Sequence, residues 1–230
     1  MTEDYSELEK ILKVDFKNKD LLAEALTHRS YLNEHRGYRL DHNERLEFLG
    51  DAVLELVVTE YLFKNYSNPE GELTNWRAAL VKGDNLAVVA DELGLERFLK
   101  MSKGEKNTLG RARRYRLANL VEAIIGAIYL DQGYVKAQRF ILDNVVVKLD
   151  EILKNKSYLD AKSYFQQKAQ ELERQTPHYE VLSESGPDHD KTFKVGVFIG
   201  EEKVAEGEGH SKQEAQRVAA ANGLKVKGWN

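Results

Sequence analysis

Hydrophobic positions along the first two thirds of the chain repeat with the spacing of amphipathic helices. Residues 5–150 keep this spacing almost throughout. Four positions around residue 50 repeat as one core face: Leu46, Leu49, Val53 and Leu56. The segment 123–130 is apolar all round, which predicts a buried helix. The pattern therefore predicts an all-α domain over residues 1–150.

The last third of the chain changes to a mixed pattern. A polar linker over 151–159 precedes an amphipathic helix over 161–174. Three segments then alternate like strands: 179–185, 193–199 and 204–209. Ser211 is placed to cap a closing helix that runs to Ala221, with Glu214 completing a capping box. This order predicts a separate α-β-β-β-α domain over residues 160–228.

Three acidic residues lie together in the helical pattern near residue 50. Glu44, Glu47 and Asp51 are at i, i+3 and i+7, so they share one helical face beside the core positions. Like charges four residues apart repel and cost a helix roughly a few tenths of a kcal/mol. A divalent cation that prefers oxygen ligands, such as Mg²⁺, would offset this repulsion. The alternative is an ordinary solvated acidic face.

A second pair of oxygen-bearing side chains lies at the entrance to the apolar segment. Asn119 and Glu122 are three residues apart, so they also share a helical face. A carboxylate carried into a buried helix must be paired, protonated or bound to a cation. Two helices that each present oxygen ligands can together form one site. The residues alone leave a metal site and a solvated acidic surface as open alternatives.

Charge is distributed unevenly along the chain. The formal net charge is −4, from 34 Lys and Arg against 38 Asp and Glu, which is unusual for a nucleic-acid-binding protein. Four arginines nevertheless cluster just before Asn119: Arg111, Arg113, Arg114 and Arg116. A basic run beside an acidic metal site would suit a polyanionic substrate. The alternative is an exposed loop whose charge serves only solubility.

Composition argues against several protein classes. The chain has no cysteine, so it has neither disulfides nor thiolate metal ligands. Its six histidines are scattered without a ligand-like pair, which argues against a zinc enzyme. No apolar run approaches membrane-spanning length, and the N-terminus lacks the basic segment of a signal peptide. These features predict a cytoplasmic protein without a membrane partner.

The segment 43–51, Asn-Glu-Arg-Leu-Glu-Phe-Leu-Gly-Asp, resembles the signature of the ribonuclease III family. Further segments resemble the family's other elements, in the family's order: 26–31, 70–73, 77–81, 117–123 and 125–131. The resemblance covers nearly all of residues 5–150. It implies an endonuclease that hydrolyses phosphodiester bonds of double-stranded RNA. The implied ligands of Mg²⁺, for which Mn²⁺ would substitute, are Glu47, Asp51, Asn119 and Glu122.

The same resemblance implies further roles and a homodimer. Glu44 would orient Arg45 or a water molecule beside the metal. Glu70 would lie in a loop near the partner subunit's site, with a simple helix N-terminal charge as the alternative. A two-fold dimer would place one site against each RNA strand, leaving 5′-phosphate and 3′-hydroxyl ends with short 3′ overhangs. Candidate dimer contacts, each of which could equally be core, are Phe48, Leu49, Leu54 and Val57. Expected substrates are precursors of ribosomal RNA and some messenger RNAs.

The predicted α-β-β-β-α domain resembles the double-stranded RNA-binding domain. Segments 160–167, 186–189 and 207–215 match its first helix, its loop and its phosphate-binding helix start. The resemblance implies RNA contacts from seven residues: Ser163, Gln166, Gln167, Pro187, His189, Ser211 and Lys212. Amides and hydroxyls would read 2′-hydroxyl groups, which disfavours a DNA nuclease, and Lys212 would meet phosphates. For His189 a plain loop residue is the alternative.

The chain departs from the family patterns at two positions. The family commonly has Asp where this chain has Asn119, which removes one negative charge from the expected metal site. The chain is therefore an active variant, an engineered substrate trap, or a relative that binds RNA without cutting it; the three intact acids favour the first. Gln213 stands where a second lysine is usual, and residues 157–230 carry ten Lys and Arg against twelve Asp and Glu. We expect weaker RNA binding than in a more basic relative.

Overall fold

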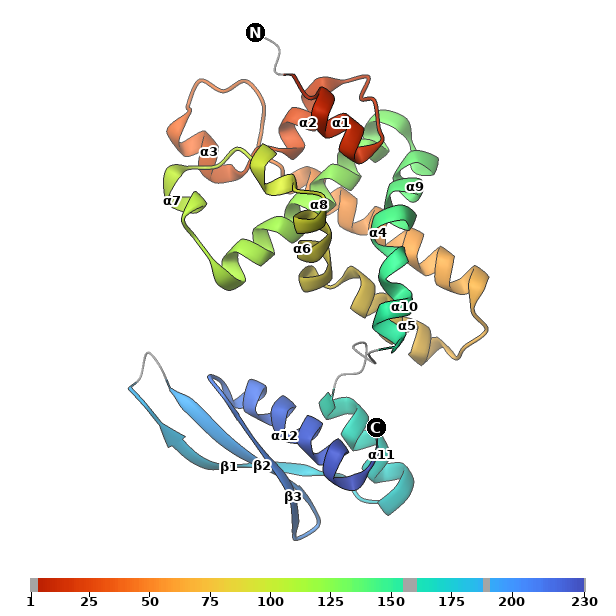
Figure 1. Ribbon diagram of the computed structural model, residues 1–230, viewed down its shortest axis with the longest axis vertical. Helices are drawn as coiled ribbons and strands as arrows, with labels where there is room; N and C mark the ends of the chain where they lie inside the picture. Colours follow the sequence, from red (N-terminus) through yellow and green to blue (C-terminus); the bar gives the residue numbers. More distant parts are fainter. Residues whose placement is uncertain (1–3, 155–160, 188–190, 230) are drawn as a thin grey trace. The chain divides into compact units, whose positions relative to one another are not determined.

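The chain folds into two compact units, Met1–Tyr158 and Leu159–Asn230, each with its own hydrophobic core. The computed structural model describes residues 4–154, 161–187 and 191–229. The described elements of the first unit are helices, and the second unit combines two helices with a three-stranded antiparallel sheet (Figure 1). This architecture confirms the predicted fold class, an all-α domain followed by an α-β-β-β-α domain.

The first unit is built from α-helices of very different length, joined by turns and loops of up to nine residues. They are α1 (Ser6–Leu12), α2 (Lys19–Ala25), α3 (Arg29–Glu34), α4 (Glu44–Asn65), α5 (Glu70–Val81), α6 (Gly83–Glu92), α7 (Lys103–Lys106), α8 (Gly110–Gln132), α9 (Tyr134–Asn144) and α10 (Leu149–Lys154). Two 3₁₀ turns, η1 (Leu95–Phe98) and η2 (Val146–Lys148), lie among them.

The long helices α4 and α8 pack against each other in the interior of this unit (Figure 1). The apolar segment of α8 is buried as predicted, with Ile124 and Ile128 fully enclosed. Its end is not: Leu130 is 53% exposed, because α8 reaches the surface two residues before it ends. The described residues contain no helix that is long and apolar enough to cross a membrane.

The buried face of α4 differs from the predicted one. Leu46 and Val53 are buried as expected, but Leu56 is 57% exposed. Leu54 and Val57, considered as dimer contacts, are fully buried instead and belong to the core. The predicted face was therefore wrong at Leu56, because the packing of α4 in the helical unit turns the side that carries Leu54 and Val57 inward instead.

The second unit has its elements in the order α11 (Ala161–Glu173), β1 (His178–Ser185), β2 (Thr192–Ile199), β3 (Glu202–Gly209) and α12 (Lys212–Lys227). The strands lie in the order β1-β2-β3, and both neighbouring pairs are antiparallel. Val197 and Ile199 of β2 join Phe165 of α11 and Leu224 of α12 in one core. The sheet therefore has one face against the helices.

The N-terminus of α12 is capped in nearly the predicted way. The Ser211 hydroxyl accepts a hydrogen bond from the Glu214 backbone N–H (3.2 Å). The Glu214 carboxylate, however, accepts from the backbone N–H of His210 (2.8 Å), one residue earlier than a standard capping box requires. The helix continues past Ala221 to Lys227, since Leu224 is buried and Gly228 supplies the left-handed C-cap.

The predicted linker begins within the first unit. Residues 151–154 continue helix α10, whereas residues 155–160 lie outside the described residues. The domain boundaries near residues 151 and 159 therefore stay a prediction.

Candidate active site

An open hollow of about 380 Å³ lies where α4 and α8 meet. The structure brings five of the predicted site residues to it: Glu44, Glu47 and Asp51 from α4, and Asn119 and Glu122 from α8. Phe48, Gly83 and Tyr115 complete much of the lining and were not anticipated as site residues. The two acidic segments, about 70 residues apart in the chain, thus face one space.

Two glycines allow α4 and α8 to approach this closely. A Cβ atom on Gly50 would lie 1.7 Å from the carbonyl oxygen of Glu122, and one on Gly126 would lie 2.2 Å from the carbonyl oxygen of Leu46. The helices therefore touch backbone to backbone, one turn or less from the acidic side chains. The sequence signal was available as Gly50 and Gly126, a glycine in each acidic segment, but its meaning requires knowing that these helices are neighbours.

Two carboxyl groups in the hollow, those of Glu122 and Glu47, hold their protons more tightly than usual. Burial, followed by the charges of Asp51 and Glu47, raises the pKa of Glu122 to about 8. Burial and the charge of Glu44 also raise the pKa of Glu47, opposed by a hydrogen bond from the Asn119 side-chain amide. A cluster of acids that resists full ionisation gains stability when a cation is added.

The donors in this hollow are chemically suited to a hard divalent cation. The carboxylate oxygens of Glu47, Asp51 and Glu122, together with the amide carbonyl oxygen of Asn119, form an all-oxygen set, which Mg²⁺ prefers. In the ranges that the structure describes, no three His, Asp or Glu side chains already stand close enough to hold one ion. The chemistry of the donors fits a magnesium ion, which usually keeps several water ligands and needs only one or two carboxylates as direct ligands.

Buried polar contacts anchor the start of α4 beside this hollow. Asn43 is almost fully buried. Its side-chain amide donates a hydrogen bond to the carbonyl oxygen of Ala25 (3.2 Å), and its backbone N–H donates one to the carbonyl oxygen of Thr27 (2.9 Å). The Thr27 hydroxyl in turn donates to the carbonyl oxygen of Ala23 (2.7 Å). The first residue of the acidic signature and the Thr-His element before α3 therefore position α4 through these hydrogen bonds.

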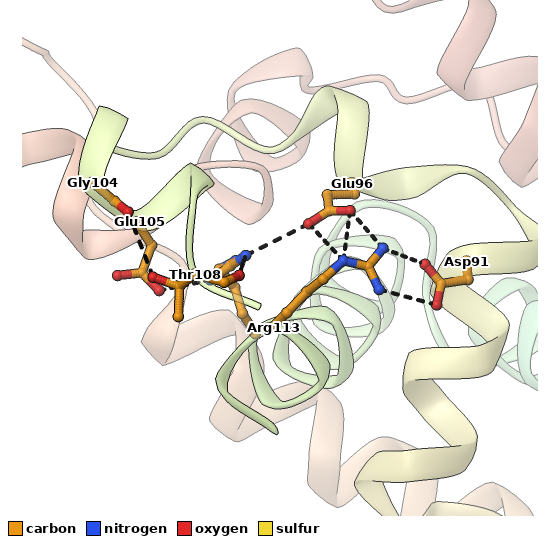
Figure 2. A network of polar contacts seen from close by, with 7 residues as sticks. Asp91, Glu96, Gly104, Glu105, Thr108 and Arg113 are labelled. Atoms are coloured by element: carbon orange, nitrogen blue, oxygen red, sulfur yellow. Dashed lines mark hydrogen bonds and ion pairs between the residues drawn. The ribbon is translucent and has the colours of Figure 1, made fainter. Parts of the chain in front are cut away.

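The arginine run before Asn119 is engaged in ion pairs rather than gathered for a substrate. Figure 2 shows the Arg113 guanidinium between Glu96 and Asp91, with contacts of 2.6 Å to each. Arg116 is buried and pairs with Glu105 at 2.7 Å. The polyanion-binding interpretation is therefore wrong for Arg113 and Arg116, because neighbouring carboxylates from α6, η1 and α7 already neutralise them.

The other two arginines of the run are exposed. Arg114 makes a loose pair with Asp84 at 3.5 Å, and Arg111 lies in the first turn of α8. These two guanidinium groups are within reach of a polyanion in solution.

Two further acids differ from expectation. Glu44 pairs with Arg29 at 3.2 Å, with no ion pair to Arg45 among the described residues, so only its alternative role beside a metal-bound water stays a prediction. Glu70 begins helix α5 instead of lying in a loop, so it does carry the helix N-terminal charge of the alternative interpretation. It lines a second hollow of about 910 Å³ together with Phe63, Tyr66 and Arg77, separate from the acidic one.

The second unit displays most of the residues expected to touch RNA. Ser163, Gln166 and Gln167 are exposed on α11, and Pro187 is exposed after β1. Ser211 and Lys212 stand at the start of α12. His189 lies outside the described residues. The RNA contacts themselves stay a prediction.

Known proteins resemble both units. Residues 18–149 match the family described as Ribonuclease-III-like, and residues 161–227 match the double-stranded RNA binding motif. "Ribonuclease 3" of Oceanobacillus iheyensis is 45% identical over 222 residues, covering 96% of this chain and 97% of that protein. "Ribonuclease 3" of Natranaerobius thermophilus is 46% identical over 218 residues, covering 94% of each.

A solved structure resembles the helical unit. The nuclease domain of Ribonuclease III from Campylobacter jejuni, described as having a flexible region involved in dimer formation, is 43% identical. It superposes with a TM-score of 0.56 and covers 62% of this chain and 96% of that one.

Proposed function

Because the chain belongs to the ribonuclease III family of endoribonucleases, we propose that it is a Mg²⁺-dependent enzyme that cuts double-stranded RNA. The observation that carries this proposal is the hollow where α4 and α8 bring Glu47, Asp51 and Glu122 together with Asn119. The same chain carries a double-stranded RNA binding motif, which supplies the matching substrate.

These four side chains would hold the cation in the proposed site. Glu47, Asp51 and Glu122 offer carboxylate oxygens, and Asn119 offers its amide carbonyl oxygen while its NH₂ group donates a hydrogen bond to Glu47. Mn²⁺, which accepts the same ligands, would substitute. When bound, the cation supplies a water of lowered pKa and neutralises charge on the scissile phosphate. The proposed products carry 5′-phosphate and 3′-hydroxyl ends.

An exposed apolar stripe on α4 supports a homodimer. Phe48 is 81% exposed and Phe63 is 79% exposed, and Leu56 lies between them on the same side of the helix. The second hollow, next to Phe63, gives such a contact a concave partner surface. A two-fold dimer would present one site to each strand and produce short 3′ overhangs, with Glu70 near the partner's site.

The cellular role follows from the substrate class. We propose that the enzyme processes structured precursors of ribosomal RNA and some messenger RNAs. We also propose that it works in the cytoplasm, where such transcripts are available.

The second candidate is a binding-only relative, and Asn119 is the observation that favours it. A neutral amide in place of a carboxylate weakens the site's attraction for a divalent cation. The intact Glu47, Asp51 and Glu122 favour the enzyme, since a site without function would be free to lose more than one ligand.

Cleavage of a long RNA duplex, followed on a gel with Mg²⁺ or with EDTA, tests the choice. Wild type, Asn119→Asp and the ligand-removing control Asp51→Asn are compared. Products from wild type only with Mg²⁺, and none from Asp51→Asn, would support the enzyme. If wild type binds the duplex without cutting it and Asn119→Asp restores cleavage, the chain is a disabled nuclease. If Asn119→Asp also fails to cut the duplex, the result would support the binding-only relative.

A further inference from the structure

The lysine expected to meet RNA phosphates already has an anionic partner in the protein. The Lys212 ammonium lies 3.3 Å from a carboxylate oxygen of Glu184 at the end of β1. It also lies over the ring of Phe193, 5.5 Å from the ring centre. The side chains of Lys212 and Glu184 are 57% and 40% exposed, so solvent and ligands reach both.

A β-bulge directs Glu184 toward this lysine. In the first half of β1, Val181 pairs with Val195 of β2; after the bulge at Leu182, Glu184 pairs with Phe193. Without the extra residue Glu184 would pair with Thr192, and its side chain would point to the opposite face of the sheet. The bulge thus turns the carboxylate to the face on which α12 lies.

The position of Lys212 on that face is equally determined by the fold. Phe193 pairs in turn with Gly209 of β3, so Glu184, Phe193 and Gly209 form one row across the sheet. A Cβ atom on Gly209 would lie 2.8 Å from the backbone nitrogen of Ala215, so β3 touches the first turns of α12 directly. The start of α12, with Lys212, is therefore held over the end of that row.

We propose that Glu184 sets the affinity of the RNA-binding unit by occupying the Lys212 ammonium as an internal substitute for phosphate. An RNA phosphate has to displace this carboxylate, or accept its negative charge nearby, before Lys212 contributes to binding. The inference deepens the proposed function and rests on it. Glu184 would thereby weaken duplex binding further than the absence of a second lysine at position 213, where the chain has Gln213, is expected to do.

Duplex-RNA affinity of the full chain in EDTA, where no cleavage occurs, tests the role of Glu184. A fluorescent RNA duplex is titrated by anisotropy with wild type, Glu184→Gln, Lys212→Gln and the double variant. Glu201→Gln is the charge-matched control, because Glu201 lies in the β2–β3 turn at the opposite end of the sheet. Circular dichroism melts confirm that each variant is folded.

We expect Glu184→Gln to tighten binding roughly two- to fivefold, the range of an exposed ion pair. The slope of log affinity against log salt should steepen by up to about one, because Lys212 then neutralises a phosphate with its full charge. The gain should vanish in the Lys212→Gln background, and Glu201→Gln should change affinity by less than about twofold because the charge is distant and screened.

The outcomes separate this inference from the proposed function. An equal gain for Glu184→Gln with and without Lys212, or a gain no larger than that of Glu201→Gln, would show general charge repulsion and overturn the inference alone. If wild type binds duplex RNA and Glu184→Gln binds it with the same affinity, the inference is also overturned. A wild-type chain that does not bind duplex RNA would refute the proposed function and this inference together.

Discussion

Replacing Gly50 by alanine tests whether the backbone contact between α4 and α8 creates the acidic site. The added methyl group would lie 1.7 Å from the Glu122 carbonyl oxygen and 2.9 Å from the Gly126 nitrogen, where ordinary contacts begin at 3.4 Å. Both neighbours are backbone atoms, so no side chain can rotate away. The helices must therefore separate by roughly the difference, ~1.7 Å.

The expected loss of stability combines two opposing effects. Alanine is a better helix former than glycine by about 1 kcal/mol. Overpacking typically costs about 1–3 kcal/mol, and a gap of ~0.5–1 Å along a packed contact already loses a quarter to a half of its dispersion energy. Because the clash is with backbone atoms in the core of the helical unit, the overpacking cost should reach the upper end of that range, about 3 kcal/mol. After the gain in helix propensity, we expect Gly50→Ala to lower the free energy of unfolding by about 2 kcal/mol.

Urea denaturation followed by far-UV circular dichroism measures this loss. Gly71→Ala is the matched control, because Gly71 lies in helix α5 with no atom within 4 Å of its added methyl group. That variant should be unchanged or more stable by up to about 1 kcal/mol. A Gly50→Ala protein within about 1 kcal/mol of wild type would refute the reasoning, since the helices would then have room to spare.

Two further predictions concern charged groups around the site. Since the folded-state pKa of Glu122 is raised from 4.5 to about 8, the contribution of Glu122 to stability is fully present below pH 4.5 and is lost as the pH rises to 8. The full pKa difference corresponds to ~5 kcal/mol, which partial exposure of Glu122 reduces to roughly 1–3 kcal/mol. Glu122→Gln should remove most of this loss, measured by urea denaturation at pH 5 and pH 8 in EDTA. An equal loss of stability between these pH values in wild type and Glu122→Gln would contradict the prediction. Arg116→Met should lower the free energy of unfolding by ~1–3 kcal/mol, because Glu105 loses its buried partner. The control Arg114→Met removes only an exposed ion pair and should change this free energy by less than about 1 kcal/mol. Equal effects of the two substitutions would show that burial of Arg116 is unimportant.

The sequence by itself determined the kind of fold and most of the candidate chemistry. Helical spacing over residues 5–150 and alternation after residue 178 are local periodicities, so they can be recognised without knowledge of the tertiary structure. The spacing of Glu44, Glu47 and Asp51 on one helix, and of Asn119 and Glu122 on another, follows from helix geometry alone. The family resemblance, confirmed by the comparisons, linked these two segments to one activity.

Tertiary packing decided which positions face inward and which charges are available. Leu54 and Leu56 are equally apolar, and only the packing of α4 in the helical unit decides that the first is buried and the second is 57% exposed. Arg113 and Arg116 look like a substrate-binding run until Asp91, Glu96 and Glu105 are seen to neutralise them.

The same limit applies to the close contacts that shape both units. Gly50 is an ordinary helical glycine in sequence, and only its neighbour on α8 makes it essential. Glu184 points toward Lys212 because one bulged residue shifts the register of β1, which alternation along a single strand does not reveal. These features depend on contacts between segments far apart in the chain, and periodicity within a segment carries no information about them.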